Sequence, residues 1–304
     1  MQRQLMAPQG PEFSRIVMGF WRLHEWGKSP QQLVAFIEQC LEMGVTTMDH
    51  ASLYGNYGNP SCEGLFGEAL RLAPQLRERL EIVTKCGINL IPPSEENGRV
   101  NHYDASSKSI VHSVEQSLQR MAIERLDVLL IHRPDYLLDA DEVANTFETL
   151  HREGKVAHFG VSNFSAAQFS LLQSRLSAPL VTNQVEISPL NTDILDSGVL
   201  EQCQQLHVSP MAWSCLGGGR LFDSHHPISQ RVLPVLQDIA VEIGAKSIDE
   251  VLYAWVLALP CQATPIVGSG KIARVKTAVD ALNLVMNREQ WARIWVAAKG
   301  HGLP

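Results

Sequence analysis

Four polar side chains follow consecutive apolar runs and could together move a proton onto an oxygen atom: Asp49, Tyr54, Lys85 and His132. A phenol, with a reference pKa of about 10, protonates a carbonyl oxygen poorly at neutral pH. A nearby lysine ammonium lowers that pKa, and an aspartate keeps the lysine charged and oriented. An imidazole can hydrogen-bond the substrate oxygen and assist proton movement. These groups predict a site that protonates an oxygen while the attached carbon accepts a hydride, for which a nicotinamide is the natural donor.

Polar residues at the ends of later strands could hold the nicotinamide. Ser162, Asn163 and Gln184 offer hydroxyl and amide groups that complement a carboxamide, although Asn163 could also serve only as a turn residue. Trp213 offers a flat apolar face for the nicotinamide ring, or it is ordinary barrel core. Further cofactor contacts are predicted for Ser214, Leu216, Gly218, Arg220, Gly268, Ser269, Lys271 and Arg274.

Two glycine-rich segments could bind the phosphates. The glycines of GGGR, residues 217–220, let the backbone approach a pyrophosphate, and the arginine adds a cation. The segment GSGKIA, residues 268–273, matches the fingerprint of open dinucleotide-binding sheets, but no later strand brings the acid expected about 20 residues on. We expect a helix N-terminus there that binds phosphate. Lys271 and Arg274 share a helix face, which favours the 2′-phosphate of NADPH.

Short apolar runs alternate with amphipathic stretches along the whole chain, with no linker or change in composition. The expected strands are Ile16–Phe20, Val45–Met48, Glu81–Thr84, Leu126–Ile131, Val156–Val161, Leu180–Val185, Val208–Ala212 and Ala263–Val267. The expected helices include Pro30–Met43, Ser106–Met121, Ala140–Glu153, Ser165–Ser174 and Ile194–Gln205. This alternation predicts one α/β domain over residues 1–304, a closed (β/α)₈ TIM barrel, with an open doubly wound sheet as the competing architecture.

Three further segments are predicted to lie outside the repeating units. Residues 2–6 and 11–15 flank a turn-like stretch and could form an N-terminal hairpin that plugs the bottom of the barrel. Two helices, Ser247–Ala258 and Arg288–Ala298, are expected to decorate the outside near the C-terminus.

Composition limits the partners and the compartment. The net charge of −7 argues against nucleic acid and anionic membranes, and no run of 18 apolar residues occurs. The six cysteines show no C-x-x-C spacing, which fits free thiols in the cytoplasm, and the N-terminus shows no signal-peptide pattern. The histidines lack metal-site spacing, so we expect no metal. The expected partner is a small-molecule carbonyl substrate, and the oligomeric state is left open, a monomer being compatible with the sequence.

A series of ordered motifs from about Ile16 to Arg274 resembles the aldo-keto reductase family. They read MGFW, GVTTMDHASLYG, EGLFGEAL, IVTKCG, LDVLLIHRPD, GKVAHFGVSNF, NQVEISPL, WSCLGGGRL and PIVGSGKIARV. The resemblance implies an NADP(H)-dependent reductase of aldehydes or ketones on a barrel fold. It implies that Tyr54 is the proton donor, since Tyr54 lies at the family's spacing from Asp49; a second phenol, Tyr57, is the alternative donor.

The resemblance also carries roles for other positions. It implies that Lys85 and Asp49 form the pair that lowers the pKa of Tyr54, and that His132 orients the substrate. Residues matching Ser162, Asn163 and Gln184 hold the nicotinamide amide in the family. An arginine at the position of Arg274 binds the 2′-phosphate, whereas Thr277-Ala278 replaces the usual adenine-contacting Glu-Asn pair.

An aromatic substrate pocket is predicted from Trp21, His24, Trp26, Tyr57 and Phe164. Such a lining favours apolar or aromatic carbonyl compounds. Two other functions remain open from sequence. Lys85 could form a Schiff base in a barrel aldolase, or the chain could be a redox-sensing or regulatory protein that binds NADPH and turns over slowly.

Overall fold

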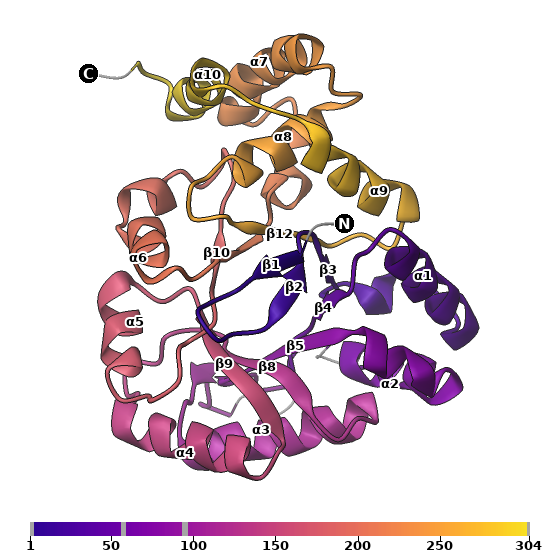
Figure 1. Ribbon diagram of the computed structural model, residues 1–304, viewed down its shortest axis with the longest axis vertical. Coiled ribbons are helices and arrows are strands. Elements are labelled where there is room, and N and C mark those ends of the chain that lie inside the picture. The colour runs from indigo at the N-terminus through magenta and orange to yellow at the C-terminus, as the bar shows by residue number, and fades with distance from the viewer. Residues whose placement is uncertain (1–2, 56–58, 93–96, 303–304) are drawn as a thin grey trace.

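Eight parallel strands close into a barrel in the order β10-β11-β12-β3-β4-β5-β8-β9 (Figure 1). The computed structural model describes residues 3–55, 59–92 and 97–302. The barrel strands are β3 (Val17–Gly19), β4 (Thr47–Asp49), β5 (Glu81–Cys86), β8 (Leu126–Ile131), β9 (Val156–Ser162), β10 (Asn183–Glu186), β11 (Met211–Trp213) and β12 (Thr264–Val267). This confirms the predicted (β/α)₈ barrel and excludes an open sheet.

A ring of helices surrounds the barrel (Figure 1). In chain order the ring contains α1 (Pro30–Glu42), α2 (Cys62–Leu72), α3 (Ser107–Met121), α4 (Ala140–Arg152), α5 (Ala166–Gln173), α6 (Val199–Leu206), α8 (Ile248–Leu257) and α9 (Ile272–Asp280). Serine caps begin several of these helices: Ser29, Ser106 and Ser165 each accept a backbone hydrogen bond at the start of their helix. The expected helix Ile194–Gln205 is interrupted, because Gly198 adopts a φ of 76° before α6 begins.

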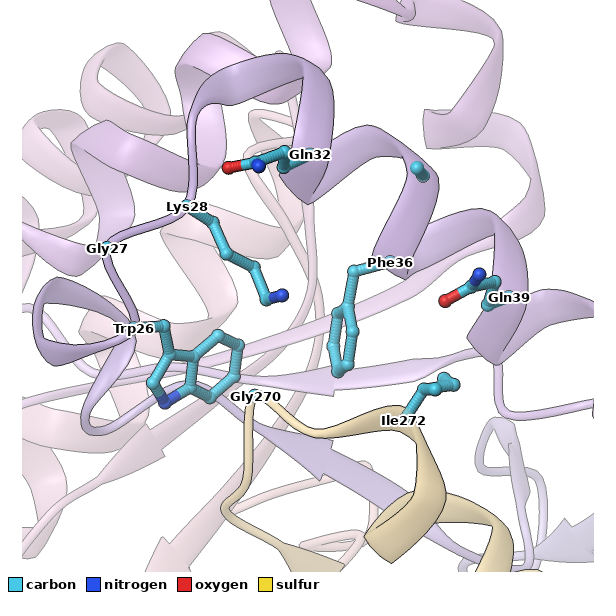
Figure 2. Close-up of a pocket in the computed structure, with 9 residues that line it drawn as sticks. Trp26, Gly27, Lys28, Gln32, Phe36, Gln39, Gly270 and Ile272 are labelled. Atoms are coloured by element: carbon cyan, nitrogen blue, oxygen red, sulfur yellow. The ribbon is translucent and has the colours of Figure 1, made fainter.

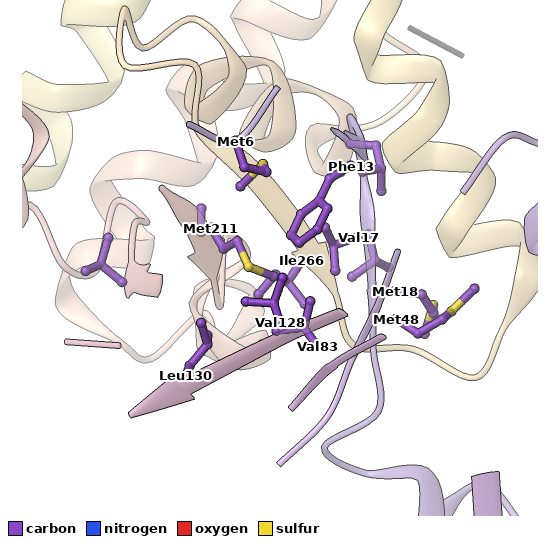
Figure 3. Packing of buried hydrophobic residues seen from close by; sticks show 14 of the residues in the cluster. Met6, Phe13, Val17, Met18, Met48, Val83, Val128, Leu130, Met211 and Ile266 are labelled. Atoms are coloured by element: carbon purple, nitrogen blue, oxygen red, sulfur yellow. The ribbon is translucent and has the colours of Figure 1, made fainter. Parts of the chain in front are cut away.

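The N-terminal hairpin closes one end of the barrel. β1 (Arg3–Leu5) pairs antiparallel with β2 (Glu12–Ser14), as predicted. Met6 and Phe13 are fully buried and lie against barrel residues such as Met211 and Val17 (Figure 3). A second short hairpin, β6 (Ile88–Asn89) with β7 (His102–Tyr103), extends the segment after β5.

The prediction for the outer helices was half wrong. The helix expected at Ser247–Ala258 is α8, which belongs to the ring and buries residues Glu250–Val256. The outer pair is α7 (Pro227–Ile243), absent from the predicted helices, and α10 (Arg288–Lys299), which pack on each other outside α8 (Figure 1). The surface of α8 is almost wholly apolar and therefore needs burial on all sides. A position in the ring provides that burial, whereas an outer position does not. No helix in the described residues has the length and apolar character needed to cross a bilayer.

Several strands end later than predicted, which places site residues inside the sheet. Asp49 is the last residue of β4, Lys85 lies within β5 and Trp213 ends β11. Asp49 pairs in register with Gly19 and Val83. The backbone hydrogen bonds of the barrel therefore fix these side chains at its C-terminal end, where barrel sites lie.

Candidate active site

Asp49, Lys85 and Tyr54 form one hydrogen-bonded unit at the C-terminal end of the barrel. The Lys85 Nζ lies 2.8 Å from both carboxylate oxygens of Asp49 and 2.7 Å from the His50 carbonyl oxygen. It lies 3.3 Å from the Tyr54 hydroxyl. Lys85 is fully buried and Asp49 is 3% exposed, so the ion pair is held away from solvent.

His132 completes the group that the sequence predicts. Its ring meets the Tyr54 ring edge to face, with centroids 6.0 Å apart. Its Nδ1 is buried and has no hydrogen-bond partner among the described residues. Burial lowers the pKa of His132 well below its usual value, and the charges of Lys85 and Arg133 act in the same direction. The imidazole is therefore neutral at neutral pH.

The electrostatics of Tyr54 differ from the prediction. Burial raises its pKa well above the usual value, and the negative charge of Asp49 adds to the rise. The expected lowering by Lys85 is not among the causes of the shift; the charge that opposes the rise is that of Arg133. Burial also lowers the pKa of Lys85, and Asp49 opposes that shift. Tyr54 therefore carries its proton at neutral pH and is available as a donor.

The predicted nicotinamide-binding residues form a connected network beside this unit. The Gln184 Nε2 donates to Asp49 Oδ1 at 2.8 Å, and Ser162 Oγ donates to the Gln184 carbonyl oxygen at 2.8 Å. Asn163 Nδ2 donates to Ser162 Oγ at 2.8 Å, while Trp213 Nε1 donates to Asn163 Oδ1 at 3.2 Å. Asn163 adopts a φ of 60°, a conformation rare outside glycine that is enriched at functional sites.

The predicted phosphate-binding segments occupy two loops at the same end of the barrel. Gly217, Gly218 and Gly219 all have positive φ, and a Cβ on Gly217 would lie 2.6 Å from a Leu190 methyl carbon. Arg220 donates to the Gly217 carbonyl oxygen at 3.1 Å and lies 3.7 Å from Glu186. The other predicted residues of this segment, Ser214 and Leu216, are partly exposed.

Lys271 is the N-cap residue of α9, and no side chain of the described residues caps this helix. Ser269 Oγ accepts a hydrogen bond from the Lys271 backbone at 3.3 Å. Arg274, in the first turn, is exposed. Gly268 is also exposed and a Cβ there would meet nothing within 4 Å. A helix N-terminus with two adjacent cations suits a phosphate.

Comparison with known proteins identifies the family. A sequence model of the Aldo/keto reductase family matches residues 15–298. The chain belongs to the aldo/keto reductase family. It is 57% identical to oxidoreductase YdhF of Escherichia coli over the full length of both chains. It is 44% identical to a 6-dehydroglucose reductase of Agrobacterium fabrum, over 95% of each chain. A thermostable aldo-keto reductase, solved with the inhibitor epalrestat, superposes with a TM-score of 0.80 at 24% identity, covering 98% of this chain and all of the other.

The residues of the predicted aromatic pocket differ in burial in this aldo/keto reductase. Trp21 is 53% exposed, whereas Phe164 is buried in the core at 3% exposure. His24 Nδ1 lies 3.4 Å from the Cys62 sulfur. Tyr57 lies outside the described residues.

Trp26 faces a cavity of about 360 Å³ between α1 and the loop before α9 (Figure 2), and its lining includes none of Asp49, Tyr54, Lys85 and His132. Phe36, Lys28 and Gly270 line the same cavity, and a Cβ on Gly270 would lie 2.5 Å from the Trp26 ring. The substrate roles of these aromatic residues stay predictions.

Arg133 is a residue that the sequence analysis passed over. Its guanidinium lies 5.8 Å from the centre of the Trp213 ring. Its charge lowers the pKa of His132, after burial and Lys85, and opposes the burial-driven rise for Tyr54. The signal was present, because Arg133 directly follows His132 in the motif LDVLLIHRPD.

Proposed function

We propose that this aldo/keto reductase reduces an aldehyde or ketone to an alcohol with NADPH as the hydride source and Tyr54 as the proton donor. The observation that carries the proposal is the Lys85 Nζ, which lies 3.3 Å from the Tyr54 hydroxyl and 2.8 Å from each Asp49 oxygen. This contact ties a protonated phenol to a buried ion pair of near-zero net charge.

The proton chemistry follows from these surroundings. The carbonyl carbon gains a hydride and its oxygen gains the phenolic proton of Tyr54, which yields the alcohol. The phenolate left on Tyr54 is then stabilised by the Lys85 ammonium, whose hydrogen bond strengthens as the oxygen becomes negative. His132, being neutral, can donate a ring N–H to the carbonyl oxygen without adding a charge.

The residues present fit a nicotinamide cofactor. Its dihydronicotinamide supplies the hydride when bound. Asn163 presents an amide group to the Trp213 ring N–H, and Gln184 presents one to Asp49. The uncapped start of α9 offers backbone N–H groups from which phosphate oxygens can accept hydrogen bonds, and the three positive-φ glycines let the backbone approach a pyrophosphate. Lys271 and Arg274 are the residues that would hold a 2′-phosphate.

The site argues against the Schiff-base alternative. Lys85 Nζ already donates to both Asp49 oxygens and to the His50 carbonyl oxygen, which stabilises the ammonium form. An ammonium has no lone pair with which to attack a carbonyl carbon.

The test is NADPH oxidation, followed by the loss of nicotinamide absorbance, across a panel of aldehydes and ketones. The panel should include 6-dehydroglucose, because the 44% identical relative from Agrobacterium fabrum is named a 6-dehydroglucose reductase. We expect steady turnover with at least one compound. Borohydride trapping of a substrate on Lys85, or one burst of NADPH oxidation without turnover, would instead support the aldolase or the regulatory alternative.

A further inference from the structure

Arg133 reaches across the mouth of the barrel, defined here as the C-terminal ends of its strands. It lies two residues beyond the end of β8, and its side chain is half-buried. Its guanidinium carbon Cζ is 5.8 Å from the ring centre of Trp213, which ends β11. In the barrel order β9, which ends at Ser162, and β10, which carries Gln184, separate β8 from β11, so this contact joins two strands that are not neighbours.

The charge of Arg133 faces the reacting groups. Burial raises the pKa of Tyr54, and Arg133 opposes that rise. Burial likewise raises the pKa of Glu186, while Arg220 and then Arg133 lower it. The positive charge of Arg133 therefore acts electrostatically on both the proton donor and Glu186.

Within residues 3–55, 59–92 and 97–302, the Arg133 guanidinium contacts the Trp213 ring and forms no hydrogen bond. Among the described residues, no carboxylate forms an ion pair with Arg133; Asp49 pairs with Lys85, and Glu186 lies 3.7 Å from Arg220. A guanidinium is always charged and presents five N–H donors in a rigid plane. Such a group at a site mouth selects molecules with acceptor oxygens.

We propose that Arg133 is a specificity-determining residue that donates hydrogen bonds to an acceptor oxygen of the substrate, a hydroxyl or a carboxylate placed a few bonds from the reacting carbonyl. The inference rests on the proposed carbonyl reduction and names its substrate class: oxygen-rich aldehydes and ketones. This substrate class differs from the apolar or aromatic carbonyl compounds that the aromatic residues of the sequence favour.

The test uses matched pairs of aldehydes that differ in their oxygen atoms. Propanal is compared with glyceraldehyde, and butanal with 4-oxobutanoate, by measuring kcat/KM with NADPH. The protein should favour the oxygen-bearing member of at least one pair, and Arg133→Met should reduce that ratio by about 10–100-fold, the value of one charge-assisted hydrogen bond. Because both members of a pair react at the same site, a general loss of activity lowers both kcat/KM values equally and leaves their ratio unchanged. A preference for glyceraldehyde identifies a hydroxyl as the acceptor, and one for 4-oxobutanoate identifies a carboxylate.

Two comparisons separate recognition from structure. Arg133→Lys keeps the charge and should retain part of the ratio for 4-oxobutanoate. Arg125→Met removes an exposed arginine just before the opposite end of β8 and should leave both ratios unchanged.

Equal ratios in the wild type and Arg133→Met would overturn the inference. If all four aldehydes were still reduced in that case, the proposed carbonyl reduction would stand without it. Should none be reduced, calorimetric binding of the product alcohols, 4-hydroxybutanoate against butanol, makes the same comparison without turnover. Arg133-dependent preference for 4-hydroxybutanoate would support the inference, and equal binding would overturn it.

Discussion

Gln184 Nε2 donates a hydrogen bond of 2.8 Å to Asp49 Oδ1 across the interior of the barrel. β10 and β4, which carry these residues, lie four strands apart in the closed order, on opposite sides of the barrel. Gln184 is 3% exposed, so the bond is sheltered from water. The residue predicted to hold the nicotinamide amide therefore also orients the carboxylate that pairs with Lys85.

Replacing this glutamine should affect cofactor binding and chemistry together. Gln184→Met removes the donor to Asp49 and the predicted contact to the carboxamide, while it keeps the side chain length. A hydrogen bond to a charged group is worth about 1.5–3 kcal/mol, so we expect both the Kd for NADPH and kcat to worsen by about tenfold or more. Fluorescence titration and steady-state kinetics measure the two effects. Gln31→Met, on the exposed face of α1, is the matched control. An unchanged kcat would show that Asp49 needs no support from Gln184.

Tyr54→Phe should remove most of kcat and spare the affinity for NADPH. The phenol supplies a proton, and loss of general acid catalysis lowers rates by about 10²–10⁴-fold. Kinetics and cofactor titration on the same preparation distinguish the two effects. Tyr136→Phe is the control, because Tyr136 is 94% exposed. If Tyr57→Phe caused the loss and Tyr54→Phe did not, the assignment of the donor would be wrong.

The sequence predicted the barrel because its strands are buried on both faces and read as short apolar runs, as Leu126–Ile131 does. It misplaced the helix Ser247–Ala258 because local pattern shows that a helix is apolar but not which layer buries it. It could not predict the bond between Gln184 and Asp49, which are 135 residues apart and meet only when the barrel closes.

The chemistry of the four residues Asp49, Tyr54, Lys85 and His132 was easier to predict than their electrostatics. The grouping of Asp49, Lys85 and Tyr54 follows from residue type and strand ends. The direction of the Tyr54 pKa shift depends on burial and on the charged groups that the fold brings around the phenol, Asp49 and Arg133 among them, and neither is visible in the sequence. Arg133 was overlooked because only the fold shows that its side chain spans the barrel mouth to Trp213.

His50 should make the fold sensitive to acid. Its ring stacks on Phe20 at 4.6 Å, and both ring nitrogens are buried without hydrogen-bond partners in the described part of the chain. Burial, helped by the charge of Lys85, lowers the pKa of His50 to about 3. In the unfolded chain this histidine has a pKa of about 6.5 and binds a proton, whereas in the folded protein it stays neutral. The free energy of unfolding therefore falls as the pH drops from about 6.5 toward 3.

His50→Phe keeps the stacked ring and removes this proton uptake. The free energy of unfolding, measured by urea titration between pH 7 and 4.5, should fall less steeply by up to about 1.4 kcal/mol per pH unit. His132 contributes with the same sign and stays in both proteins. His225→Phe, at an exposed position, serves as the control. Identical slopes for wild type and His50→Phe would show that the ring is hydrated or protonated in the folded state.

Arg274 should decide the choice between NADPH and NADH. It lies in the first turn of α9, three residues after the N-cap residue Lys271, where the helix dipole already favours an anion. A charge-assisted hydrogen bond from its guanidinium to the 2′-phosphate, worth about 1.5–3 kcal/mol, would favour NADPH by roughly 10–100-fold. Burial raises the pKa of the Asp249 carboxyl in α8, and the charge of Arg274 opposes that rise. Arg274→Ala should weaken the binding of NADPH by about tenfold or more and leave that of NADH unchanged, as measured by the Kd of each cofactor.

The control for charge alone is Arg288→Ala, because Arg288 is an exposed arginine in the first turn of α10. Equal weakening of both cofactors, or of neither, would place the 2′-phosphate elsewhere.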